Sequence, residues 1–267
     1  MVNFEMKSHY DYEDLLQVVH ILRSPGGCPW DQEQTHRSIR RDFLEEAYEA
    51  AEAIDTGDTA LLREELGDVL LQVILHAQME TEAETFDIGD VCNDICKKLI
   101  IRHPHVFGDV VAETAEVVLT NWEAIKQQTK GQTTKTQTLD SVPRTFPALM
   151  RAQKLQSRSK KAGVDMNKLF SPGQKADCAM EQLKAAMECG DAAAVDNALG
   201  ELMFSLVAVA RDYDLDPEFS LSKKNDDFLR QFAAMETLAQ QQNIAINDAS
   251  ETVLADLWEQ ADKNTGK

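Results

Sequence analysis

The sequence predicts an all-α protein organised around a hairpin of two long helices. Residues 38–56 and 59–84 are both rich in Ala, Leu and Glu, and only a short break separates them. In that break, Gly57 suits the left-handed residue just past a helix end, and Asp58 suits the N-cap of the next helix. We therefore expect two antiparallel helices that fold back on each other.

The second half of the chain repeats this pattern at an offset of 133 residues. Gly57 and Asp58 recur as Gly190 and Asp191, and the glycine at position 67 recurs at position 200. A constant offset through two helices indicates two copies of one helical unit. A polar, Thr-rich stretch at residues 129–143 resembles a linker. The expected organisation is a first domain at residues 1–128, this linker, and a second domain at residues 144–267.

Apolar spacing and breakers predict the other helices. Trp30 lies in the stretch Cys28 to Asp31, which we expect to be a proline-stiffened loop, and it either plugs the end of the bundle or stacks on a base; the plug is favoured. In the fourth helix, Val91, Ile95 and Leu99 are expected to face the core. The helices are expected at residues 10–23, 38–56, 59–84, 87–102, 113–126 and 147–162.

Four acidic side chains are placed to converge between the two hairpin helices. Glu46 and Glu49 are three residues apart, as are Glu65 and Asp68, so each pair projects from one helix face. Four anions in such a seam repel each other unless cations compensate them. Mg²⁺ is the natural compensation, with Mn²⁺ as a second choice. The alternative is a solvated helix face, but a glycine at position 67 in mid-helix suggests close helix packing beside the acids.

The second copy has lost these acids. At the same offset, Glu46 corresponds to Ala179, and Glu65 corresponds to Ala198. The helix pattern survives this loss, so the carboxylates are not needed to make the fold. The remaining two correspondences are Glu49 with Gln182 and Asp68 with Glu201.

Composition limits the possible partners. The formal net charge of −19 argues against binding to a nucleic-acid polymer, because little basic surface is available to release counterions. Five scattered cysteines suggest buried thiols in a reduced, cytoplasmic protein, and Cys92 and Cys96 lack a second pair that would complete a zinc site. Neither a leader-like segment nor an apolar run of membrane-spanning length is recognised, so no membrane partner is expected.

Basic residues and histidines leave alternatives open. Arg37, Arg40 and Arg41 precede or begin the first acidic helix, and they either contact phosphate or are i,i+4 partners of Glu45. Lys98 and Arg102 either bind anionic oxygens or are solvated. His76, in an apolar run, is more often a satisfied core residue than a metal ligand.

Several motifs together resemble the MazG family of nucleoside triphosphate pyrophosphohydrolases, in its tandem form. The motifs are Cys28-Pro29-Trp30-Asp31, the Glu-Glu-x-x-Glu of residues 45–49, the Glu-Leu-Gly-Asp of residues 65–68, Arg102-His103-Pro104-His105-Val106-Phe107, and Met150-Arg151-Ala152-Gln153-Lys154.

The resemblance implies two MazG-like helical bundles, an association into homodimers, and a Mg²⁺-dependent hydrolase. Such an enzyme cuts a nucleoside triphosphate into the monophosphate and pyrophosphate. The family's metal pattern maps onto Glu46, Glu49, Glu65 and Asp68, and its downstream basic residues map onto Lys98 and Arg102. The second copy lacks the quartet, so activity is expected in the first.

As a mechanism, Glu45 or Glu49 would accept the proton of the attacking water. Lys98 and Arg102 would offset charge on the leaving pyrophosphate, and Trp30 would bind substrate. A di-iron bundle oxidase is a poor rival, because neither acidic helix carries a His three residues after a Glu. A non-catalytic nucleotide-binding or regulatory protein of the same fold is the remaining alternative.

Overall fold

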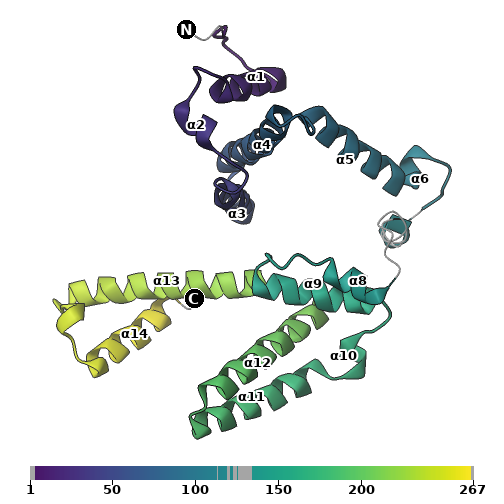
Figure 1. Cartoon of the computed structure of the whole chain (residues 1–267). Helices are drawn as coiled ribbons and strands as arrows, with labels where there is room; N and C mark the ends of the chain where they lie inside the picture. Colours follow the sequence, from purple (N-terminus) through teal and green to yellow (C-terminus); the bar gives the residue numbers. More distant parts are fainter. Residues whose placement is uncertain (1–3, 113, 119–120, 123–124, 126–133, 266–267) are drawn as a thin grey trace. The chain divides into compact units, whose positions relative to one another are not determined.

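The computed structural model of the chain describes residues 4–112, 114–118, 121–122, 125 and 134–265. Every regular element in this part is helical, which confirms the predicted all-α class (Figure 1). The chain divides into two compact units, Met1–Lys130 and Gly131–Lys267. Each unit is described separately below.

The first unit surrounds a hairpin of two antiparallel helices. Its core contains Val19 of the first helix, Ile39 just before the first hairpin helix, and Ile74, Leu75 and Met79 of the second hairpin helix. The buried Arg23 side chain ties the unit together, since it binds the Glu82 carboxylate at 2.8 and 2.9 Å and donates to the carbonyl of Asp31. The helices are α1 (Tyr12–Arg23), α2 (Pro29–Glu33), α3 (Arg40–Thr56), α4 (Thr59–Glu82), α5 (Ile88–Arg102) and α6 (Pro104–Phe107).

The predicted turn between the hairpin helices is confirmed. Gly57 has φ +69° and ends α3 in the left-handed conformation. The Asp58 side chain then accepts hydrogen bonds from the backbone N–H groups of Ala60 and Leu61, so it caps α4. These two residues fix where one helix stops and the next begins.

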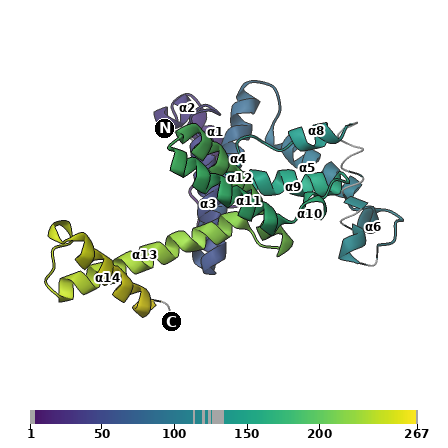
Figure 2. The ribbon, with the colours of Figure 1, turned by 90° about the horizontal axis from the view of Figure 1, so that it is seen from below.

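The second unit contains the same hairpin. Gly190 has φ +67°, and the Asp191 side chain accepts hydrogen bonds from the N–H groups of Ala193 and Ala194. This agreement in turn and cap confirms the internal repeat inferred from the sequence. The helices are α8 (Lys135–Asp140), α9 (Ala148–Lys161), α10 (Met166–Leu169), α11 (Pro172–Cys189), α12 (Ala192–Asp212), α13 (Pro217–Gln241) and α14 (Glu251–Thr265) (Figure 2).

Two features of the second unit lie beyond the hairpin. α14 folds back along α13 and forms a small core of its own with Met235, Ala239, Leu257 and Ala261 (Figure 1). By length and composition alone, α12 is long and apolar enough to cross a membrane, and the core helices of soluble proteins can be so too. The expectation that no segment reaches that length is therefore wrong.

Two segments predicted to be irregular are helical. Pro29 occupies the first position of α2, where a missing N–H costs nothing, so Pro29 begins a helix instead of stiffening a loop. Trp30 is 59% exposed on this helix and does not plug the bundle. Within the predicted linker, Thr134 forms a capping box with Gln137 and starts α8, whose Thr138 carbonyl accepts a 2.8 Å hydrogen bond from Arg158.

Other expectations about packing are wrong. Val91, Ile95 and Leu99 are 37–46% exposed, because in the described residues α5 leads away from the hairpin without a helix covering this face (Figure 1). Cys92 and Cys96 are exposed thiols on the same helix. A Cβ on Gly67 would meet no described atom within 4 Å, so the close helix approach expected there does not occur among the described residues. Part of the helix expected at residues 113–126, including Glu123, and residues 129–133 of the linker lie outside the described residues.

Two glycine substitutions in the second unit should have opposite effects on stability. Gly190→Ala should lower the free energy of unfolding by about 1 kcal/mol, because alanine is strained at positive φ. Gly200→Ala should raise it by up to about 1 kcal/mol, because this mid-helix position faces open space. Urea unfolding followed by circular dichroism measures both. A destabilised Gly200→Ala variant would show that another surface packs there.

Candidate metal centre

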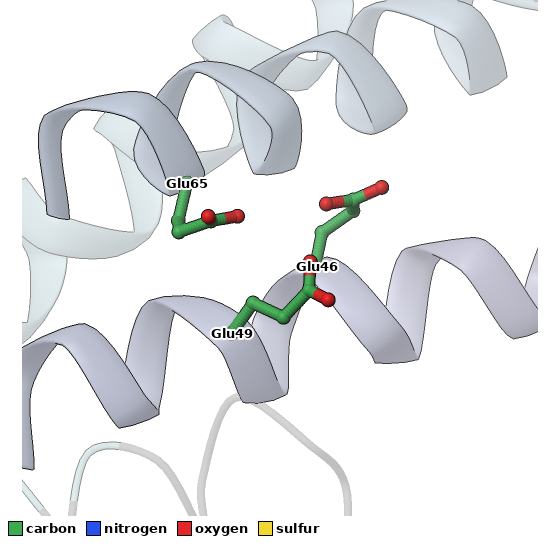
Figure 3. Close-up of side chains that lie close together, drawn as sticks. All are labelled: Glu46, Glu49 and Glu65. Atoms are coloured by element: carbon green, nitrogen blue, oxygen red, sulfur yellow. The ribbon is translucent and has the colours of Figure 1, made fainter. Parts of the chain in front are cut away.

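Three carboxylates meet in the seam between α3 and α4. Glu46 and Glu49 project from α3 and Glu65 projects from α4 (Figure 3). One carboxylate oxygen from each lies within 4.8 Å of the others. The hairpin thus brings together three of the four residues that the sequence predicted as metal ligands.

Asp68 lies one turn beyond Glu65 and contributes through its charge. It is half-buried, and it helps to raise the pKa of both Glu46 and Glu65. The fourth predicted ligand therefore interacts electrostatically with Glu46 and Glu65, although its oxygens are outside the group that lies within 4.8 Å.

The seam makes two of these acids, Glu46 and Glu65, resist ionisation. Burial is the main cause that raises the pKa of Glu65, and the charges of Glu49 and Asp68 add to it. Burial also raises the pKa of Glu46, followed by the charges of Asp68, Glu49 and Glu65. None of the ion pairs in the described part of the chain involves these four carboxylates. Converging, uncompensated oxygen ligands fit a hard divalent cation.

The second unit shows what the seam looks like without these acids. Ala179 and Ala198, at the positions of Glu46 and Glu65, are 2% and 5% exposed. Gln182 and Glu201 are exposed. Small apolar side chains thus fill the seam of the second hairpin, and the described part of that unit holds no comparable group of metal-ligating side chains.

Glu45 lies on a different face of α3 from Glu46. Its carboxylate is 3.7 Å from Nε of Arg41, so the pairing alternative for Arg41 is confirmed. A shallow groove of about 420 Å³ runs along this face, and Glu49 both lines the groove and belongs to the metal-ligand group. The groove is lined by Arg41, Leu44, Glu45, Tyr48, Glu49 and Glu52.

The predicted substrate-binding residues lie apart from the carboxylates. Trp30 is exposed on α2, and Lys98 is exposed on α5. Arg102 is 7% exposed, and its guanidinium carbon lies 5.0 Å from the centre of the Trp122 ring. Within the described residues none of the three contacts the carboxylate group, so their roles in substrate binding stay predictions.

At the far end of the seam, His76 is a hydrogen-bonded residue, as favoured from the sequence. Its Nδ1 atom is 2.7 Å from Nδ1 of His36, and the two rings are stacked with centroids 5.0 Å apart. The Phe43 ring of α3 contacts His76 edge-on at 5.8 Å. His36 also reaches Glu80 at 2.7 Å. These contacts hold the start of α3 against α4.

Gln72 is a residue of the seam that the sequence motifs do not include. It is a polar residue within the otherwise apolar run from Val69 to Leu75, and it is 7% exposed. Its position four residues after Asp68 places it on the same face of α4 as the acids. Its polarity within the apolar run and its spacing from Asp68 are both visible in the sequence, and together they indicate a residue of the seam.

Comparison with known proteins assigns the hairpin to a family. Residues 34–107 match the model of the MazG nucleotide pyrophosphohydrolase domain. The chain is 39% identical over 252 residues to the nucleoside triphosphate pyrophosphohydrolase of Escherichia coli K12, covering 92% of this chain and 95% of that protein. It is 37% identical over 250 residues to the nucleoside triphosphate pyrophosphohydrolase/pyrophosphatase MazG of Thermotoga maritima, with 94% and 95% covered.

A further relative is longer than this chain. The uncharacterized protein YabN of Bacillus subtilis is 40% identical over 254 residues, which are 95% of this chain and 52% of YabN. The chain thus spans about half the length of that relative and nearly all of the other two.

The raised pKa values predict a pH-dependent stability difference. In the metal-free protein at pH 7, Glu65→Gln should raise the melting temperature, because it removes a buried charge among like charges. A carboxyl with a raised pKa favours folding when protonated, so the wild type gains stability as pH falls through the raised pKa towards the ordinary value of 4.5. The difference between variant and wild type should therefore shrink by pH 5. A difference that is constant from pH 7 to 5 would contradict this reasoning.

Proposed function

Because the chain belongs to the MazG family of nucleotide pyrophosphohydrolases, we propose that it hydrolyses nucleoside triphosphates to monophosphates and pyrophosphate in its first unit. The observation that supports this proposal is the convergence of Glu46, Glu49 and Glu65 with no ion pair to a basic group among the described residues. With Asp68, they would hold Mg²⁺ or Mn²⁺. The relatives named above as nucleoside triphosphate pyrophosphohydrolases support the same reaction.

The residues of the chain would then have separate roles in the reaction. A bound divalent cation supplies positive charge for the phosphate oxygens and makes a water molecule more acidic. Glu49, which borders both the ligand group and the groove, is placed to accept a proton from the attacking water, and Glu45 is the second candidate. Lys98 and Arg102 would stabilise the leaving pyrophosphate, if a conformational change or a second chain brings them to the site.

A non-catalytic, nucleotide-binding or regulatory role is the alternative. The alanine-filled seam of the second unit supports a non-catalytic role for that half of the chain. We therefore assign the chemistry to the first unit and a structural role to the second.

Glutamine substitutions in the two units test this assignment. Glu65→Gln should abolish Mg²⁺-dependent release of pyrophosphate and leave helical content unchanged, because the amide removes a ligand charge and keeps the side-chain shape. Glu201→Gln, at the position of Asp68 in the second unit, is the matched control and should retain wild-type activity. Mass spectrometry of the products from a panel of ribo- and deoxyribonucleoside triphosphates identifies the bond cleaved. Retained activity in Glu65→Gln counts against the metal centre, and no product from any triphosphate favours the binding protein.

We also propose that the chain forms a homodimer. Val91, Ile95 and Leu99 form an exposed apolar stripe along α5, and such a stripe is unfavourable in water unless a second surface covers it. A second copy could also bring Lys98, which lies on the same helix, towards the carboxylates. A cytoplasmic location and the absence of membrane and nucleic-acid partners stay predictions.

A charge placed in this stripe should separate the copies. Ile95→Asp should convert a dimer to a monomer in sedimentation velocity experiments, since an aspartate cannot be buried there without a partner. Lys97→Gln is an exposed control on the same helix with the same change in net charge. A dimer that persists in Ile95→Asp would place the interface elsewhere.

A further inference from the structure

Gln72 carries a hydrogen-bonding atom that the chain does not use. The side chain is 7% exposed, and its Oε1 atom is shielded from solvent and has no hydrogen-bond partner in the described structure. Buried polar atoms are almost always paired, because a lost hydrogen bond to water is otherwise not replaced. An unpaired acceptor in a seam of functional acids suggests that its partner arrives with a ligand.

The contacts across the hairpin locate Gln72. On α4 it lies four residues after Asp68 and four before His76. On the opposite helix, Glu46 interacts with Asp68, while Phe43 contacts His76. Gln72 therefore lies in the seam between the carboxylates and the histidine–phenylalanine cluster. One helical turn, about 6 Å along the axis, separates it from Asp68.

The seam is closed on the other side of the carboxylates. There Ala50 and Ala53 are 8% and 1% exposed, and the helices meet at the tight turn that begins with Gly57. In the other direction Asp68 and His76, one helical turn on either side of Gln72, are only half-buried. A ligand whose phosphates lie at the carboxylates therefore extends its remaining part more readily on this side. In a nucleoside triphosphate that part is the sugar and base, which follow the α-phosphate directly.

We propose that Oε1 of Gln72 accepts a hydrogen bond from the nucleoside part of the substrate, and so helps to select it. The proposal rests on the function proposed above. An acceptor needs a donor, so the group that it contacts is a sugar hydroxyl or an N–H of the base. A site built to pair such a donor discriminates against analogues that lack it, because the buried acceptor is then left unpaired.

The second unit provides a matched position. Ser205 stands where Gln72 stands in the repeat and is 3% exposed. It is in the copy that lacks the carboxylates, so Ser205→Ala should not change nucleotide binding. Gln72→Met is the informative variant, because methionine has a similar shape and removes the acceptor and donors together.

The experiment compares a nucleotide with a ligand that has only its phosphates. We would measure the Mg²⁺-dependent binding of α,β-methylene nucleotide analogues and of inorganic tripolyphosphate by calorimetry. Gln72→Met should weaken binding of the nucleotide analogues about tenfold, the usual effect of one hydrogen bond, and leave tripolyphosphate binding unchanged. A loss confined to ribonucleotides identifies the 2′-hydroxyl, a loss that depends on the base identifies a base N–H, and a uniform loss identifies the 3′-hydroxyl.

The thermal stability of the ligand-free variant gives a second readout. Gln72→Met should melt a few degrees above the wild type, because it removes an unpaired buried acceptor. Equal effects on nucleotide and tripolyphosphate, or no effect on either, overturn the role of Gln72 and leave the proposed function intact. A variant that melts well below the wild type also overturns it, since the amide then has partners inside the protein. If the wild type binds neither ligand with Mg²⁺, the proposed function fails and this inference fails with it.

Discussion

The repulsion among the acids between α3 and α4 is the constraint that the rest of the first unit has to offset. Glu46, Glu49 and Glu65 converge within 4.8 Å, and burial and mutual charge raise the pKa of two of them. This arrangement opposes folding in the absence of a cation, and the rest of the unit offsets it. The packed core around Val19, Ile39 and Ile74, and the bidentate Arg23–Glu82 pair that joins α1 to α4, keep the unit folded despite the repulsion. A cation would turn the same oxygens from a destabilising group into a binding site.

The second unit separates the fold from the chemistry. Its hairpin has the same left-handed glycine and the same aspartate cap, but Ala179 and Ala198 fill the seam. The turn and caps therefore determine the hairpin, and the acids are an addition to it. This difference within one chain explains why we assign hydrolysis to the first unit alone.

The sequence predicted those features that local chemistry determines. The turn at Gly57, the cap at Asp58 and the convergence of the acids follow from residue type and helical spacing. The structure shows the turn and the cap, and it brings three of the four predicted acids together. Features that depend on distant packing were predicted less well. Apolar spacing on α5 indicated a buried face, yet periodicity does not say whether the covering surface belongs to the same chain. Arg102 was expected near anionic oxygens, and its contact with Trp122 depends on a tertiary contact that spacing does not reveal.

The shared turn has a consequence for protein engineering. Gly190 and Asp191 hold the helices of the second hairpin in the register of the first, with alanines where two of the first hairpin's acids stand. The second hairpin therefore offers a backbone of the same geometry without metal ligands, and new ligand side chains could be introduced at positions 179 and 198 without redesigning the backbone.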